Sequence, residues 1–315
     1  MKQVNTVLGP VPIDQLGWVL MHEHLIIFYP GWELDGRNSY DREHDIALLS
    51  EEVAGLRQFG VKTILDATPV DLGRDVGFMI EVAKRSGVNI IASTGLYMES
   101  NWFPTYFRMR TVDELTEWMV YEITEGIGET GVKAGAIKVA TGHGRIGQHE
   151  EKALRAAARA QKKTGAPILT HTENGTMGKE QLDIFEEEGA DLSRIIIGHS
   201  CGNSDLRYHL EILKRGAILG LDRIGITLLM PDEIRRGIAM NAIGAGYASQ
   251  IIMSQDIVGA TYGRISTLPA GTGRLPHRTY SYLLTDFIPK LRQAGVGERA
   301  IETIMCDVPR KFFGE

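Results

Sequence analysis

Short apolar runs rich in Val and Ile alternate along the chain with longer polar segments that carry apolar residues at helical spacing. Such alternation is typical of repeated strand–helix units, in which parallel strands are buried on both faces and read as almost continuous apolar runs. Eight runs are predicted to be strands: residues 18–27, 61–66, 88–94, 135–141, 167–172, 194–199, 217–222 and 250–256.

The segments between these runs predict helices, several of which end at a glycine that supplies a left-handed cap before the next strand. The stretches "RQFGVKT" and "KRSGVNI" are two examples. The predicted helices cover residues 45–59, 77–86, 112–127, 149–164, 178–189, 204–214, 232–246 and 277–294, and a further amphipathic helix with a short tail is predicted over residues 297–315.

Eight strands separated by helices close most naturally into a (β/α)8 TIM barrel, an α/β fold that we expect to occupy residues 1–315 as a single domain. A doubly wound sheet is the alternative fold. However, the sequence has no G-x-G-x-x-G after an early strand and no G-x-x-x-x-G-K-[ST], the phosphate-binding loops of nucleotide-binding sheets. The barrel is therefore the favoured architecture.

Composition narrows the classes of partner. With 34 Lys+Arg against 40 Asp+Glu the formal net charge is -6, so a basic surface for nucleic acid is not expected. The two cysteines, Cys201 and Cys306, lie far apart in the sequence, which fits a reducing compartment. The sequence shows neither the pattern of a signal peptide nor an apolar run as long as a membrane span. We therefore expect a cytoplasmic protein without a membrane partner.

Chemistry in a barrel of this kind gathers where the carboxyl ends of the strands meet. The predicted strands place only a few metal-binding or ionisable side chains at those ends. They are His22 and His24 on the first strand, Lys138 on the fourth, His171 on the fifth, His199 on the sixth and Asp256 on the eighth.

His22 and His24 lie on one side of their strand because side chains alternate, and two imidazoles so placed suit one metal ion. A pair of hydrogen-bonded core histidines is the alternative, and the histidines at two further strand ends disfavour it. Lys138 is expected to be buried, where it either pairs with a carboxylate such as Asp256 or reacts with carbon dioxide to give a carbamate. Asp256 would ligate a metal and accept a proton from water, or else cap a helix.

Taken together, these residues resemble the binuclear subtype of the amidohydrolase superfamily. The stretches "GPVPIDQLGWVLMHEHL", "IKVAT", "PILTHTENGTMGKEQLDIFEEEGADLSRIIIGHSCGNSDL", "GLDRIG" and "VPRKFF" resemble the phosphotriesterase family, especially its lactonase branch, over residues 4–314. The resemblance implies that Lys138, carboxylated by carbon dioxide, bridges two divalent metals together with a hydroxide. It also implies the remaining ligands, namely His22, His24 and Asp256 for the more buried metal and His171 and His199 for the more exposed one.

The resemblance extends to two residues beside the metals. It implies that Tyr97, after the third strand, lies at the metal centre and that Arg223, after the seventh, lines a lactone pocket; a half-buried aromatic and a surface arginine paired with Asp222 or Asp232 are the alternatives. Asp222 itself is expected to orient polar groups behind the site. Tyr262, in the Gly-rich segment after the eighth strand, is expected to line an apolar substrate pocket or to be a packing anchor. The remaining histidines are expected to be structural or solvent-facing: His44, His143, His149, His209 and His277.

The resemblance thus implies a hydrolase that opens lactones by attack of the bridging hydroxide, with promiscuous phosphotriesterase activity. Phosphotriesters, aryl esters or phosphorylated sugar lactones are alternative substrates, and a catalytically silent barrel stabilised by metal is a further alternative. Zinc is the expected metal, with cobalt, manganese or iron as alternatives, because imidazole and carboxylate ligands suit all four. The family resemblance also implies a homodimer that binds a small-molecule substrate.

Overall fold

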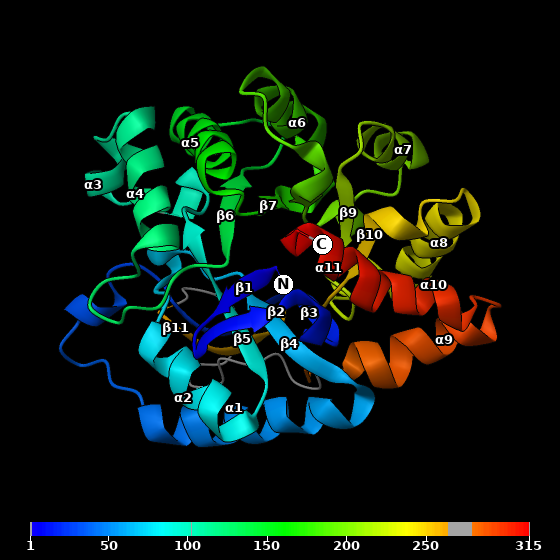
Figure 1. Ribbon diagram of the computed structural model, residues 1–315, viewed down its shortest axis with the longest axis horizontal. Helices are drawn as coiled ribbons and strands as arrows, with labels where there is room; N and C mark the ends of the chain where they lie inside the picture. The colour runs from blue at the N-terminus through cyan, green and yellow to red at the C-terminus, as the bar shows by residue number, and fades with distance from the viewer. Residues whose placement is uncertain (1, 102, 264–278, 315) are drawn as a thin grey trace.

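Nine parallel strands form one sheet in the order β10-β9-β8-β7-β6-β5-β4-β3-β11, and helices surround it as an outer layer (Figure 1). The computed structural model describes residues 2–101, 103–263 and 279–314. The sheet closes where Asp256 N donates to the His22 carbonyl at 3.0 Å and His24 N donates to the Ile257 carbonyl at 2.9 Å. The predicted (β/α)8 barrel is therefore confirmed. Its strands are β3 (Trp18–Phe28), β4 (Val61–Asp66), β5 (Asn89–Gly95), β6 (Ala136–Thr141), β7 (Ile168–Thr172), β8 (Ile195–Ile197), β9 (Ile218–Leu221), β10 (Ile251–Met253) and β11 (Val258–Tyr262).

The strand predicted over residues 250–256 is shorter in the structure, where β10 ends at Met253, and a further strand, β11, begins at Val258. β3 is 11 residues long, and the backbone N–H and C=O groups of its carboxyl-terminal half need hydrogen-bond partners. β11 supplies that partner, from Val258 opposite His24 to Tyr262 opposite Phe28. The predicted strand is thus present as the shorter β10, and β11, which begins beyond the predicted range, was not predicted.

The helices follow the prediction closely at most positions. The first begins earlier than the predicted residue 45, because Asp41 caps it by accepting a hydrogen bond from His44 N at 3.0 Å. The helix predicted over 277–294 is described from residue 282, and the tail predicted as one helix is divided by a π-helical turn, Thr303–Asp307. The helices are α1 (Arg42–Gly55), α2 (Val76–Ser86), α3 (Thr105–Arg108), α4 (Val112–Thr124), α5 (Gln148–Thr164), α6 (Gly178–Glu187), α7 (Leu206–Lys214), α8 (Asp232–Gly244), α9 (Ile288–Gln293), α10 (Glu298–Glu302) and α11 (Val308–Phe313).

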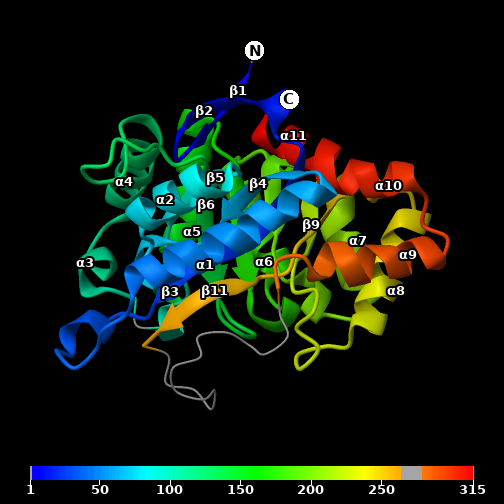
Figure 2. The same ribbon diagram turned by 90° about the horizontal axis from the view of Figure 1, so that it is seen from below.

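A hairpin that the sequence pattern did not predict covers one end of the barrel. β1 (Gln3–Thr6) pairs antiparallel with β2 (Gly9–Pro12), and both strands are short and contain proline or polar residues. The hairpin and α11 lie at the end opposite to the tip of β11, with both chain termini beside them (Figure 2). The hairpin therefore does not cover the opposite end of the barrel, the mouth formed by the carboxyl ends of the strands, where the candidate site lies.

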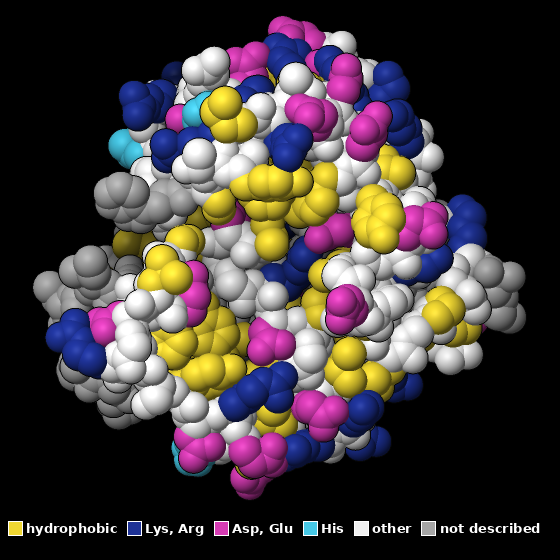
Figure 3. Space-filling model, turned by 90° about the vertical axis from the view of Figure 1, so that its left-hand side faces the viewer, with side chains coloured by type: hydrophobic (Ala, Val, Ile, Leu, Met, Phe, Trp, Pro, Cys, Tyr) yellow, Lys and Arg dark blue, Asp and Glu magenta, His cyan; other side chains and the backbone are white. Residues whose placement is uncertain are grey.

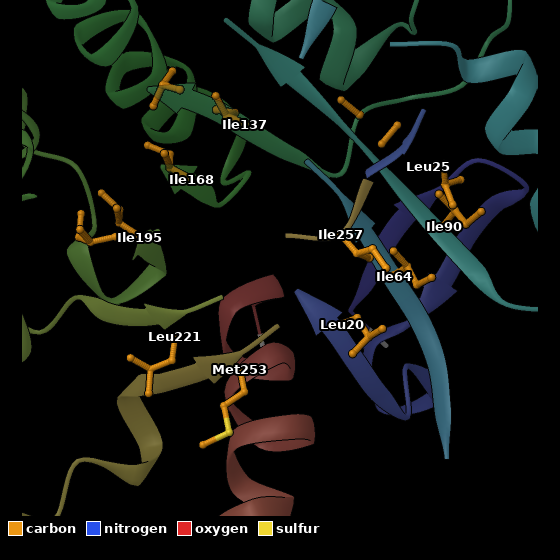
Figure 4. Close-up of a cluster of buried hydrophobic side chains, with 14 of the residues drawn as sticks. Leu20, Leu25, Ile64, Ile90, Ile137, Ile168, Ile195, Leu221, Met253 and Ile257 are labelled. Atoms are coloured by element: carbon orange, nitrogen blue, oxygen red, sulfur yellow. The ribbon is translucent and has the colours of Figure 1, made fainter. Parts of the chain in front are cut away.

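The buried apolar residues form two clusters, one between the strands and the helices and the other inside the barrel. The larger contains alternate strand residues, such as Ile64, Ile90 and Ile168, that pack against the helices (Figure 4). Their neighbours Leu65 and Leu169 belong to the smaller cluster, which fills the closed end of the barrel. Along β7 the residue that follows Leu169 on the same face toward the mouth is His171, so the apolar core of this strand ends where the site begins.

The face that carries α3 and α4 is hollowed, and hydrophobic side chains gather around the hollow (Figure 3). Large apolar side chains on these elements are exposed, with Tyr106 at 63%, Met109 at 79% and Tyr121 at 56%. Patches of this kind are typical of contact surfaces.

Candidate metal centre

The six predicted ligands lie together at the mouth of the barrel. The ring of His22 is 5.6 Å from that of His24 and 4.7 Å from that of His199, and the His199 ring is 4.5 Å from that of His171. Lys138 Nζ lies 2.8 Å from His22 Nε2. Residues from distant parts of the chain therefore form one buried cluster.

Asp256 lies among three of these imidazoles. Its Oδ1 is 3.2 Å from His24 Nε2 and 3.8 Å from His22 Nε2, and its Oδ2 is 3.7 Å from His199 Nε2 and 3.0 Å from Arg223 Nε. Burial opposes ionisation of this carboxylate, but the histidines and Arg223 outweigh it and hold the pKa of Asp256 well below its usual range. The carboxylate of Asp256 is thus ionised, and its oxygens can serve as metal ligands at the centre of the cluster.

A register shift in β3 explains how both of its histidines reach the site. Met21 belongs to the cluster inside the barrel, so regular alternation would bring Glu23, not His22, to that side. β3 shifts register against β4 between Leu20 and Glu23, as a β-bulge does. His22 and His24 consequently both face the mouth.

Three of the histidines are held at Nδ1. Asp222 Oδ2 lies 2.7 Å from His22 Nδ1, and Asp222 Oδ1 lies 2.9 Å from His199 Nδ1. Asp222 Oδ1 also accepts a hydrogen bond from the backbone N–H of His199 at 2.7 Å. Thr68 Oγ1 lies 2.8 Å from His24 Nδ1. A proton held at Nδ1 leaves the lone pair of Nε2 facing the cluster, which is how partners outside a metal site orient histidine ligands.

His171 is turned the other way. Its Nε2 lies 2.9 Å from Glu173 Oε2, and its Nδ1 lies 3.2 Å from the Tyr97 hydroxyl. Glu173 therefore holds the proton at Nε2, and Nδ1 is the nitrogen left to bind a metal. Tyr97 is fixed in turn by Asp71, whose two carboxylate oxygens each accept Tyr97 N at 2.9 Å.

Burial sets the protonation states that a metal requires. Burial and the neighbouring Lys138 lower the pKa of His22 to about 4, and burial lowers the pKa of His171 to about 4. Burial also holds the pKa of His199 well below its usual range. Burial lowers the pKa of Lys138 to about 7, so its neutral amine is populated near neutral pH. Neutral imidazoles and an ionised carboxylate are the forms that bind metal ions.

The residues present fit a divalent metal centre. His22, His199 and Asp256 offer ligand atoms that all lie within 4.8 Å of one another. Nitrogen and oxygen donors of this kind suit zinc, cobalt, manganese or iron. Further donors adjoin these three, namely His24, His171 and Lys138.

Arg223 and Tyr262, both predicted to bind substrate, lie in different surroundings. Arg223 is buried and forms its ion pair with Asp256. Tyr262 packs with Phe28, Trp32 and Tyr40, with ring centroids 5.0–5.4 Å from its own, and its hydroxyl donates to Asp45. These contacts are typical of a packing anchor, and a contact of Tyr262 with substrate stays a prediction.

The other histidines lie away from the cluster. His44 is exposed on α1, and buried His209 lies with Nε2 3.1 Å from the Ser200 carbonyl. His149 lies 3.8 Å from Glu99, and His143 borders a cavity beside the site. His277 falls outside the described residues.

Sequence reasoning missed several residues that hold the ligands. Glu23 is fully buried, and its carboxylate accepts Ser254 Oγ at 2.7 Å, Gln255 N at 3.0 Å and Ile257 N at 2.8 Å. These donors flank Asp256, whose backbone has the left-handed φ of 50° that non-glycine residues rarely adopt. The position of Glu23 between two predicted ligands was the available signal, and Glu173 likewise follows His171 by two residues.

A buried cluster of imidazole and carboxylate ligands at the mouth of a (β/α)8 barrel is typical of a metal-dependent hydrolase. The model of the Phosphotriesterase family matches residues 2–313. The chain belongs to this family.

Named relatives resemble the chain along its length. An aryldialkylphosphatase of Saccharolobus solfataricus is 36% identical, with 95% of each chain covered. A phospho-furanose lactonase of Mycoplasmopsis agalactiae is 31% identical, with 99% of this chain and 91% of the relative covered. The crystal structure of a PTE-like lactonase variant from Deinococcus radiodurans matches with a TM-score of 0.93 and 35% identity, covering 99% of this chain and 100% of that one.

Proposed function

We propose that this chain opens lactones by hydrolysing their ester bond and hydrolyses phosphotriesters more slowly. The observation that carries the proposal is the ionised carboxylate of Asp256, which lies 3.2 to 3.8 Å from the Nε2 atoms of three histidines. Relatives named as a lactonase and an aryldialkylphosphatase support the two classes of substrate.

The proposal includes two divalent cations, with zinc the first expectation and cobalt, manganese or iron as alternatives. Such cations, when bound, supply Lewis-acid activation of the ester and of a water molecule. Lys138 is proposed to be carboxylated: its neutral Nζ bonds to the carbon of carbon dioxide and releases a proton to solvent, leaving a carboxylate that would hold both ions. The other ligands are His22, His24 and Asp256 for one ion and His171 and His199 for the other.

The side chains around the ligands have separate tasks in this proposal. Asp256 accepts a proton at its carboxylate, and Arg223 Nε, 3.0 Å from Oδ2, fixes the orientation of that group. Tyr97 and Arg223 border the space where the substrate ring would lie. Asp222 and Glu173 hold the imidazoles in the tautomers that leave Nε2 or Nδ1 free.

Phosphorylated sugar lactones form a second candidate class. Relatives from two Mycoplasmopsis species, 31% and 30% identical, are named phospho-furanose lactonase. Aryl esters and phosphotriesters as main substrates are the remaining candidates, and they require the same ligands.

A substrate screen with metal analysis tests the proposal. The purified protein would be analysed for metal by mass spectrometry and assayed with acyl-homoserine lactones, γ- and δ-lactones, aryl acetates and a phosphotriester. We expect two metals per chain and fastest turnover of a lactone. A phosphotriester or aryl acetate as the fastest substrate would overturn the lactonase proposal. Complete inactivity with two metals bound would indicate a catalytically silent barrel.

We further propose a single-domain homodimer located in the cytoplasm. The exposed side chains of Tyr106 on α3, Met109 directly after it and Tyr121 on α4 support a contact surface between copies. None of the helices in the described ranges is long and apolar enough to cross a membrane. Light scattering of the purified protein measures the mass of the assembly, and a monomer mass would contradict the dimer.

A further inference from the structure

A cavity of about 530 Å³ adjoins the candidate metal centre on the side of β5, β6 and β7. We call it the side chamber and define it by Met98 after β5, Arg108 of α3, His143 and Arg145 after β6, and Glu173 after β7. Its volume lies in the range of pockets that enclose small organic ligands.

The side chamber and the metal centre share a wall. Glu173 lines the chamber and bonds through Oε2 to His171 Nε2. Met98 also lines it and follows Tyr97, whose hydroxyl lies 3.2 Å from His171 Nδ1. A substrate whose ester bond lies at the metals therefore has the chamber beside it for a substituent of its ring.

The carboxylates of the chamber are already engaged by the chain. Glu150 Oε1 accepts Glu99 N at 3.0 Å, and Glu150 Oε2 accepts Gly142 N at 3.2 Å and Gly147 N at 2.7 Å. Glu173 is bonded to His171, and Glu99 lies 3.8 Å from His149 Nε2. Both oxygens of Glu150 and one oxygen of Glu173 thus already accept hydrogen bonds from the chain itself.

The chamber's two arginines are not engaged in this way. Across the described ranges, neither Arg108 nor Arg145 has a carboxylate within 4.0 Å, and Arg108 Nε is a buried donor without an acceptor. Such donors are rare in folded proteins, because an unmade hydrogen bond of a buried group is costly. Nearby Arg110 also has a buried Nε without an acceptor, but its guanidinium pairs with Glu114 at 2.9 Å and lies over the Tyr106 ring.

We propose that the side chamber binds an anionic substituent of the substrate, a carboxylate or a phosphate, through Arg108 and Arg145. Planar guanidinium groups bind both kinds of anion through paired hydrogen bonds. The inference rests on the proposed lactonase function and deepens it, because it assigns an acidic lactone as the preferred substrate.

Kinetics on matched lactones test this assignment. Three γ-lactones that carry an alkyl, a carboxylate or a phosphate group at the same ring position would be compared in the wild type, R108Q, R145Q and the control R110Q. We expect the wild type to prefer an anionic lactone, and R108Q to raise its KM about tenfold with kcat little changed. R145Q should have a smaller effect because Arg145 is exposed. The kinetics of the neutral lactone should be unchanged in every variant. Whichever anionic lactone, carboxylate or phosphate, shows the larger rise of KM in R108Q identifies the group that the chamber binds.

A binding measurement separates failure of the chamber from failure of the proposed function. The cyclic ether that lacks the lactone carbonyl but carries the same anionic group cannot be hydrolysed, and its affinity would be measured by calorimetry. Weaker binding in R108Q than in R110Q supports the chamber even if no lactone is turned over. Equal binding in R108Q, R110Q and the wild type overturns the inference, as does equal loss of activity on neutral and anionic lactones.

Discussion

Asp222 Oδ2 lies 2.7 Å from His22 Nδ1, although the two residues are 200 positions apart in the sequence. The other oxygen of the same carboxylate lies 2.9 Å from His199 Nδ1. Burial opposes ionisation of Asp222, but His199 and His22 hold its pKa well below the usual range. One carboxylate thus fixes the tautomer of two candidate ligands, one for each proposed metal.

Substitution of this carboxylate should therefore remove metal from the protein. In D222N the amide nitrogen replaces one oxygen and donates to the facing Nδ1, which moves the imidazole proton to Nε2 and blocks ligation. We expect metal affinity to fall by about 10- to 100-fold. Metal content after dialysis against a weak chelator measures the effect, with D183N on the surface as the matched control. Two tightly bound metals in D222N would contradict this role.

Glu23 should control the activity of Asp256 through the backbone on either side of it. In E23Q one carboxylate oxygen becomes an NH2 group, which must face either the pair Ser254 and Gln255 or the single donor Ile257. Two donors then oppose each other, and at least one of the three hydrogen bonds is lost. We expect kcat to fall at least tenfold and the free energy of unfolding to fall by about 1–3 kcal/mol.

S254A provides the graded comparison for Glu23, because it leaves both backbone N–H donors to Glu23 in place and removes only the Ser254 hydroxyl, which donates to Glu23 and accepts His22 N at 3.0 Å. Its loss of kcat should be smaller than that of E23Q. The two variants would be compared at equal metal content, by steady-state kinetics and urea unfolding. Wild-type kcat in E23Q would exclude Glu23 as a positioning residue for Asp256.

The strands and the residues at their ends were predictable from the sequence, because burial on both faces gives apolar runs that stop where the polar ligands begin. Which atoms meet there was not predictable. The bond between Asp222 and His22 depends on how far the barrel curves between β9 and β3, and the orientation of His22 depends on a register shift against β4. Neither quantity has a local pattern in the sequence.

Local rules also failed where tertiary pairing decides the structure. β2 contains Gly9, Pro10 and Pro12, residues that argue against strands, yet the hairpin is stabilised by packing across the closed end of the barrel. β11 begins at Val258, two residues after Asp256, and exists because the long β3 offers it an edge. A pattern of single residues cannot show how long the neighbouring strand will be.

Asp71 should make the stability of the protein fall as pH rises. Burial raises its pKa to about 7, above the ordinary value of 3.8, so between these values the folded protein keeps a proton that the unfolded chain has lost. The stability contributed by this group is therefore highest below about pH 4, declines up to about pH 7 and is constant above it, with a total change of at most about 4 kcal/mol.

The substitution D71N isolates this contribution. The amide that it introduces cannot ionise and can still accept Tyr97 N through its oxygen, so the stability of D71N lacks this pH dependence. The difference in unfolding free energy between D71N and the wild type, measured in urea at several pH values, should grow in favour of D71N between pH 4 and pH 7. A difference that stays constant with pH would show that Asp71 is ionised in the folded protein throughout that range.

Lys138 should determine whether the protein holds a second metal. Its Nζ is fully buried, 2.8 Å from His22 Nε2, and its pKa of about 7 leaves an amine able to react with carbon dioxide. We expect K138A to lose the second metal and at least 100-fold in kcat, and added acetate or formate to restore part of both by occupying the vacated space as a free carboxylate. Arginine at this position cannot form a carbamate, so K138R should not be restored, and K84A on the surface serves as the control. Native mass spectrometry should detect the mass of one carbon dioxide on the wild type and not on K138A. Two metals and full activity in K138A without added carboxylate would exclude the bridging role.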